Sequence, residues 1–222
     1  MLTLLTVLIL LRQGSGGQAV VFLTGGFWGM KMIDVGTVGI LRIGAEVKDC
    51  AERHSPAVVG GFGKQLGTCA AWIVAMQQVL DEGIYPRLVL EADAVACGAW
   101  PEQIGVPDDA RWLWVGLSKF YRTTGQTVLE DPGYVVQGDV IDMAGMCATH
   151  GVMILNEEGA RQMQWAAVHG VRWDLPIDIA VIVMCRTKKW IRHALRFPLV
   201  YQEGVNEKFT RIWINAEGMI KE

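Results

Sequence analysis

A helical pattern that leads directly into a fully apolar strand is the feature that most limits how this chain can fold. Residues 65–82 place their apolar side chains mostly on one face of a helix, and Gly83 follows as a typical helix stop. After Pro86, residues 88–90 are Leu-Val-Leu with no polar position, which is typical of a strand buried on both faces of a sheet. A helix and a doubly buried strand so close together predict an α/β fold.

Two carboxylates follow the apolar run, Glu91 and Asp93. Open α/β sheets bind ligands beyond the carboxyl ends of their strands. If the strand continued, these side chains would point to the same face, because they are two positions apart. Carboxylates on one face repel unless a cation, a proton or hydrogen bonds compensate. The pair predicts a site for Mg²⁺ or Mn²⁺ with a nucleotide diphosphate; the alternative is a solvated turn after a strand.

Composition narrows the class of protein. The chain has 222 residues, of which 51% are hydrophobic and 19% charged, so a globular domain is expected. The net charge of −3 offers no global attraction to nucleic acid or to an anionic membrane. Five scattered cysteines without a Cys-x-x-Cys pair favour free thiols in a reducing cytoplasm. The apolar residues 1–11 are too few to span a bilayer, so we expect a buried strand there and no stable membrane insertion.

Further elements are predicted along the chain. A second helix is expected from Asn156, a favourable N-cap residue, to about His169, with Gly170 as its stop. A third helix is expected to open within residues 173–178. The polar segment 101–107 is expected to be a short helix or a loop. Other strands are expected at residues 2–11, 19–24, 111–117, 149–155 and 197–201.

Five sequence blocks, taken in order, resemble glycosyltransferase family 25 of the lipopolysaccharide-biosynthesis type. They are a glycine loop with a helix start, the acidic motif, a strand followed by a helix, a Pro-x-Asp block and a closing strand, at residues 63–72, 88–94, 149–160, 175–178 and 197–203. The match covers about residues 57–205. The resemblance implies a single GT-A-like, Rossmann-like domain over residues 1–222, with a mixed central sheet flanked by helices.

The resemblance implies transfer of a hexosyl or pentosyl group from a nucleotide-sugar donor to a hydroxyl, assisted by Mn²⁺ or Mg²⁺. Asp93 would be a metal ligand in the catalytic site, and Glu91 a second ligand or a contact to the donor. Asp178 of the Pro-x-Asp block is the candidate general base, with Asp174 as a less favoured substitute. The alternative role for Asp178 is to cap the following helix.

A second set of residues is expected to contact the donor. Gly63, Lys64 and Gln65 lie at a helix start, where backbone N–H groups and a lysine suit phosphate. His150 leads a strand and is a candidate contact to the diphosphate or acceptor. Lys64 as a solvated loop charge and His150 as a structural histidine are the alternatives.

Departures from the family pattern keep a second function open. Ala92 stands where the family has the first aspartate of its acidic motif, and residues 1–56 lack the family's usual opening. The alternative is a catalytically inactive GT-A-like module that binds a nucleotide or glycan. For an active enzyme the acceptor is a glycan or a hydroxymethylated DNA base, as some phage glycosyltransferases use. A basic cluster keeps the DNA option open, although such clusters are usually solvated helix faces; it comprises Arg186, Lys188, Lys189, Arg192 and Arg196.

Overall fold

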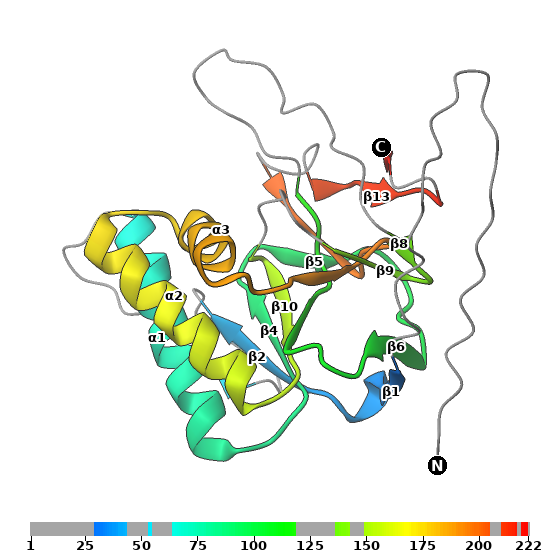
Figure 1. The fold of residues 1–222 in the computed structure, drawn as a ribbon, viewed down its shortest axis with the longest axis horizontal. Helices are drawn as coiled ribbons and strands as arrows, with labels where there is room; N and C mark the ends of the chain where they lie inside the picture. The colour runs from blue at the N-terminus through cyan, green and yellow to red at the C-terminus, as the bar shows by residue number, and fades with distance from the viewer. Residues whose placement is uncertain are drawn as a thin grey trace, which may run out of the picture.

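The computed structural model describes residues 29–43, 53–54, 64–118, 136–142, 149–204, 210–216 and 219–221. At its centre is an eight-stranded sheet with the order β3-β2-β4-β10-β7-β11-β9-β8 (Figure 1). Its strands are β2 (Gly39–Ile43), β3 (Arg53–His54), β4 (Arg87–Glu91), β7 (Trp112–Trp114), β8 (Val136–Gln137), β9 (Val140–Asp142), β10 (Gly151–Ile154) and β11 (His193–Leu195).

The sheet is mixed. Strand β2 pairs in parallel with β3 and β4, whereas β10 runs antiparallel between β4 and β7. Strand β11 is parallel to β7 and antiparallel to β9. The prediction of an α/β fold with a mixed central sheet is therefore confirmed.

Three helices cover one face of this sheet: α1 (Lys64–Glu82), α2 (Glu157–Trp173) and α3 (Ile177–Lys188) (Figure 1). Trp72 of α1 and Met163 of α2 join Val89 of β4 in one apolar core. Helix α2 crosses α1 closely at Gly170, where a Cβ atom would lie 2.7 Å from Cys69 Sγ. That close approach explains the glycine, because a larger side chain would push the helices apart.

Short strands cover the opposite face. One two-stranded sheet pairs β1 (Met30–Asp34) with β6 (Gln103–Pro107), and another pairs β5 (Ala94–Ala96) with β12 (Val200–Gln202). Leu88 and Leu90 of β4 belong to this second core, together with Ile33 and Ile104. Successive side chains of a strand point to opposite faces, so the apolar run in β4 supplies both cores at once.

Several predicted elements are confirmed. Helix α1 ends at Gly83, which has a φ of +60° and donates its N–H to the Val79 carbonyl. The Asn156 side chain caps α2 by accepting from the Gly159 N–H at 2.9 Å. The expected strand at 111–117 is the shorter β7, and the expected strand at 197–201 is β12.

Other expectations were wrong or lie outside the described residues. Helix α2 does not stop at Gly170 but continues to Trp173 and ends at Asp174, which has a left-handed φ of 53°. Residues 103–107 form strand β6, because pairing with β1 satisfies their backbone. The strands expected at 2–11 and 19–24 lie outside the described residues. Within the described ranges, every helix is too short or too polar to span a lipid bilayer.

Candidate functional site

Three carboxylates gather beyond the carboxyl end of β4. The strand ends at Glu91, and Asp93 lies in the turn that leads to β5, so the expected same-face arrangement along one continuous strand is wrong. Asp93 is exposed, while Asp178 is half-buried in the first turn of α3. Both lie close enough to Glu91 to raise its pKa by charge repulsion. We call Glu91, Asp93 and Asp178 the acidic cluster.

Glu91 is held by two hydrogen bonds to the same oxygen. Trp72 Nε1 donates to Oε1 at 3.1 Å, and Thr149 Oγ1 donates to it at 2.7 Å. Burial raises the Glu91 pKa to about 7; the two hydrogen bonds oppose that rise, and the charges of Asp93 and Asp178 add to it. Near neutral pH this carboxyl is therefore divided between its protonated and ionised forms.

Trp72 and Thr149 are site residues that the sequence did not reveal. Trp72 is fully buried, and its indole N–H needs an acceptor inside the protein. Thr149 lies just before β10, the strand that pairs with β4. In the sequence, Trp72 is a tryptophan on the apolar face of a helix. That pattern predicts a core residue but does not reveal which carboxylate the residue contacts.

Strand β12 fixes the position of Asp93. Gln202 Nε2 donates to Asp93 Oδ2 at 2.7 Å, and the Glu203 N–H donates to the Asp93 carbonyl at 2.9 Å. The acidic motif and the closing strand, which are 109 residues apart at this bond, are therefore neighbours. This contact holds an exposed carboxylate at a defined place.

His150 lies beneath the same edge of the sheet. Its carbonyl accepts from the Glu91 N–H at 3.0 Å, and its side chain is 2% exposed. A Cβ atom at Gly116 would lie 2.2 Å from His150 Nε2, so the imidazole packs directly on that glycine. Nε2 has no hydrogen-bond partner among the described residues. Burial lowers the pKa of His150 to about 4, against the opposing effect of Asp93, so the ring is neutral at pH 7.

Asp178 does not cap its helix, so that alternative was wrong. The N-cap position of α3 is Pro176, and the Asp178 carboxylate accepts from the Ile179 N–H at 2.8 Å. Asp174, the substitute candidate, is exposed at the end of α2. Of these two aspartates, Asp178 is the one whose charge acts on Glu91.

The remaining predicted residues are less informative. Gly63 lies outside the described residues, and Lys64 and Gln65 begin α1 with side chains that are also outside the description.

The basic cluster is not one surface. Arg186, Lys188 and Lys189 are exposed, but Arg192 is only 3% exposed and lies 5.7 Å from the Trp114 ring centroid, while Arg196 lies over Phe197.

The acidic cluster fits a cation that is shared with a substrate better than a cation enclosed by protein. In the part of the chain that the structure describes, no three His, Cys, Asp or Glu side chains are arranged to hold a metal ion. Mg²⁺ is commonly bound by one or two carboxylates together with substrate phosphates and water. Asp93 and Glu91 could supply those carboxylates.

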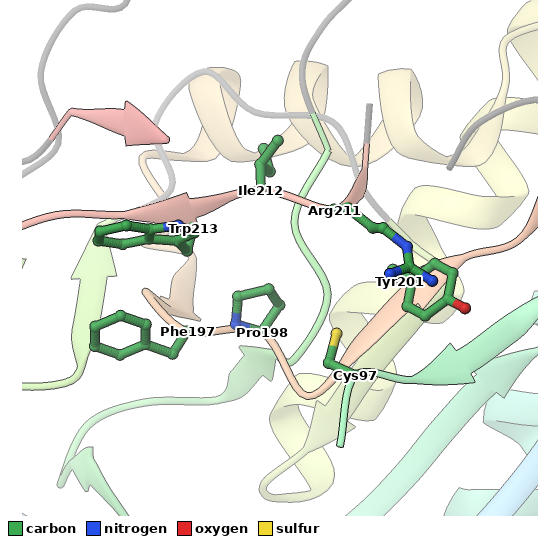
Figure 2. Close-up of a pocket in the computed structure, with 7 residues that line it drawn as sticks. All are labelled: Cys97, Phe197, Pro198, Tyr201, Arg211, Ile212 and Trp213. Carbon is green, nitrogen blue, oxygen red and sulfur yellow. The ribbon is translucent and has the colours of Figure 1, made fainter. Parts of the chain in front are cut away.

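A pocket of about 370 Å³ lies elsewhere, and none of the residues that line it belongs to the acidic cluster (Figure 2). No protein-family model matches the chain, and a search of curated proteins finds no match.

Proposed function

We propose that this chain is a glycosyltransferase that moves a sugar from a nucleotide-sugar donor to a hydroxyl acceptor, with the donor diphosphate held at the acidic cluster. One observation carries the proposal: the carboxylates of Asp93, in the turn after β4, and of Asp178, at the start of α3, both lie close enough to act on Glu91 at the carboxyl end of a central strand. Ligands of open α/β sheets bind at such ends.

The roles follow from exposure and charge. A Mn²⁺ or Mg²⁺ ion bound with the donor would act as a Lewis acid that stabilises the leaving diphosphate. Asp93 is exposed and held by Gln202, so it is the residue we assign to hold the cation. Glu91, with its pKa near 7, would serve as a second ligand or as a contact to the donor.

Asp178 is the residue we assign to accept the proton of the acceptor hydroxyl. It is half-buried, and it comes from a different element than Glu91 and Asp93. A base must lie within hydrogen-bond reach of the proton that it removes. Transfer to acceptor should therefore fall in Asp178→Asn more than hydrolysis of the donor does.

The test is release of nucleotide from UDP-, GDP- and CMP-sugars in the presence of Mn²⁺ or Mg²⁺. We expect turnover of at least one donor that stops in EDTA. Asp81→Asn, an exposed carboxylate on α1, is the matched control for substitutions of the acidic cluster. If the protein binds nucleotide but turns over none of these donors, the proposed glycosyltransferase activity is contradicted.

That outcome would leave the second candidate, an inactive nucleotide- or glycan-binding module. Two observations favour it: Ala92 replaces a carboxylate of the family motif, and hydrogen bonds already occupy Glu91 Oε1 and Asp93 Oδ2.

If the enzyme is active, the salt dependence of acceptor binding separates its two acceptor classes, because binding to DNA weakens steeply as salt rises and binding to a neutral glycan does not.

A further inference from the structure

Helix α2 carries a row of aromatic rings on the side that faces away from the apolar core. The Trp165 and His169 ring centroids lie 4.7 Å apart, and those of His169 and Trp173 lie 4.6 Å apart. Helix α3 packs against α2 (Figure 1), and Trp190 just after α3 lies 5.8 Å from Trp165. Trp165 and Trp173 are 39% and 44% exposed, so both tryptophans of α2 reach solvent.

Aliphatic side chains extend this aromatic surface. Val168 is three positions after Trp165 and therefore lies on the same side of α2. It is 44% exposed, and Ile191, which follows Trp190, is 48% exposed. Apolar side chains that are exposed together and rimmed by polar residues mark an interaction surface.

Basic side chains lie beside the apolar ones. The Lys188 Nζ atom lies 4.9 Å from the Trp165 ring centroid. Arg172 is seven positions after Trp165, so it lies about two turns further along the same side of α2. Both basic side chains are exposed. We call Trp165, Val168, Arg172, Trp173 and Lys188 the aromatic–basic face.

The described charges around this face are mostly positive. Between residues 165 and 191, four exposed side chains are basic and one is acidic: Arg172, Arg186, Lys188 and Lys189 against Asp174. Asp109 is a second acidic neighbour, because it lines a small pocket together with Lys189. The excess of positive charge favours an anionic partner and disfavours a symmetric dimer, in which this face would meet its own copy.

The arrangement of the rings favours a lipid surface over a nucleic acid. Single-stranded nucleic acids stack their bases on the flat faces of aromatic side chains. Here Lys188 lies over the Trp165 ring, and the rings of Trp165 and His169 meet edge to face at 85°. Exposed aliphatic side chains such as Val168 give a phosphate backbone no contact, but they suit the acyl boundary of a bilayer.

We propose that the aromatic–basic face binds the surface of an anionic lipid bilayer. Tryptophan is favoured at the headgroup level, because its ring is apolar and its N–H is polar. Trp165 and Trp173 would lie at that level, with Val168 toward the acyl chains. Arg172 and Lys188 would contact lipid phosphates, since anionic headgroups attract basic side chains. The face lies on the bilayer without crossing it, and the inference does not depend on the proposed function.

The test is co-sedimentation of the full chain with lipid vesicles, without donor or metal. We expect partitioning into phosphatidylcholine vesicles that contain about one-third phosphatidylserine to be at least about tenfold stronger than into pure phosphatidylcholine. Raised salt should weaken it, because the charges are exposed. The double variant Arg172→Gln/Lys188→Gln should lose about tenfold. Trp173→Ala should lose about fivefold, and Trp173→Phe should recover most of that loss.

Matched controls carry the same changes outside the face. Lys31→Gln/Lys221→Gln removes two charges from strands β1 and β14 (Ile220–Lys221), and Trp213→Ala removes a tryptophan that is 38% exposed. Both should partition like the wild type.

Four outcomes overturn the inference. They are no binding to the anionic vesicles, equal binding to anionic and neutral vesicles, and equal losses in the face variants and their controls. The fourth is a dimer, or tight binding of single-stranded DNA, that the face variants abolish while vesicle binding stays unchanged. Donor hydrolysis is a separate measurement, so its absence would defeat the proposed enzyme and leave this inference standing.

Discussion

The acidic cluster and the pocket lined by Phe197 and Trp213 are joined by one short pair of strands, β5 and β12, but are built in opposite ways. Glu91 is largely buried and tied to Trp72 and Thr149, whereas Phe197 and Trp213 stack at the surface. One place gathers carboxylates, and the other presents aromatic surface to solvent. Their contrast shows that one short pair of strands can hold an exposed carboxylate in place near one end and lie beside stacked aromatic rings near the other.

The largest expected effect comes from Asp93→Asn. This change removes the exposed charge that we assign to the cation but keeps an acceptor for Gln202, so the fold should survive. We expect metal-dependent donor turnover to fall by about a hundredfold or more. Turnover assays check this, with Asp81→Asn as control and urea unfolding of both variants to show that the fold is kept. Near-wild-type turnover would remove Asp93 from the site.

Gly116→Ala tests the packing beneath the acidic cluster. A Cβ atom there would lie 2.2 Å from His150 Nε2 and 2.5 Å from its Cδ2, so the buried ring must move. We expect unfolding free energy to fall by about 2–3 kcal/mol, as is typical of overpacking. Urea unfolding measures the loss.

A double-mutant cycle sharpens this result. In a His150→Ala background the added methyl group has room, so Gly116→Ala should cost at least about 1 kcal/mol less there. Equal losses of unfolding free energy in the two backgrounds would show that the effect of Gly116→Ala does not come from its contact with His150.

Glu91→Gln tests the electrostatics of the acidic cluster. Burial raises the folded pKa of Glu91 from 4.5 to about 7, so the folded state keeps a proton that the unfolded state loses between these values. Its stabilising contribution is complete below about pH 4.5 and is lost as pH rises through 7. Glu91→Gln should remove this loss. The unfolding free energy of the variant minus that of the wild type should therefore be up to about 3 kcal/mol larger at pH 8 than at pH 4.5.

The matching measurement is urea unfolding from pH 4 to 8 in EDTA. His150 has the opposite sign: its pKa is lowered from 6.5 to about 4, so its contribution is present above pH 6.5 and is lost as pH falls through 4. In the wild type the contributions of Glu91 and His150 change in opposite directions with pH. In Glu91→Gln only the His150 contribution remains, so the unfolding free energy should rise from pH 4 to 6.5. Glu203→Gln, at an exposed residue beside β12, should leave the wild-type profile unchanged.

Gly67→Ala has the smallest expected effect and the opposite sign to Gly116→Ala. Gly67 lies within α1, and a Cβ atom there would meet no atom of the described residues within 4 Å. Alanine favours the helix, so we expect a stabilisation of roughly 0.5–1 kcal/mol. A destabilisation in the same urea experiment would contradict the open space around this position.

Local patterns predicted much of the helical layer and the central strand. The apolar face of 65–82, the Gly83 stop and the Asn156 cap depend on neighbours a few residues away, so sequence was enough to find them. Strand β6 was missed because its partner β1 lies about 70 residues earlier. A glycine at position 170 predicts a helix stop from sequence, but its role in the structure is close packing on Cys69, a contact between two helices that a local pattern does not reveal.

The sequence by itself determined that a doubly buried strand ends at a carboxylate and that a helix precedes it. Those features follow from periodicity and turn chemistry, which are local. Only the tertiary structure decided that Glu91 is bound by Trp72 and Thr149, that Asp93 meets Gln202, and that Trp213 stacks on Phe197. These contacts join segments distant in sequence, so the resulting pKa values and pocket depend on how the sheet and its covering layers pack.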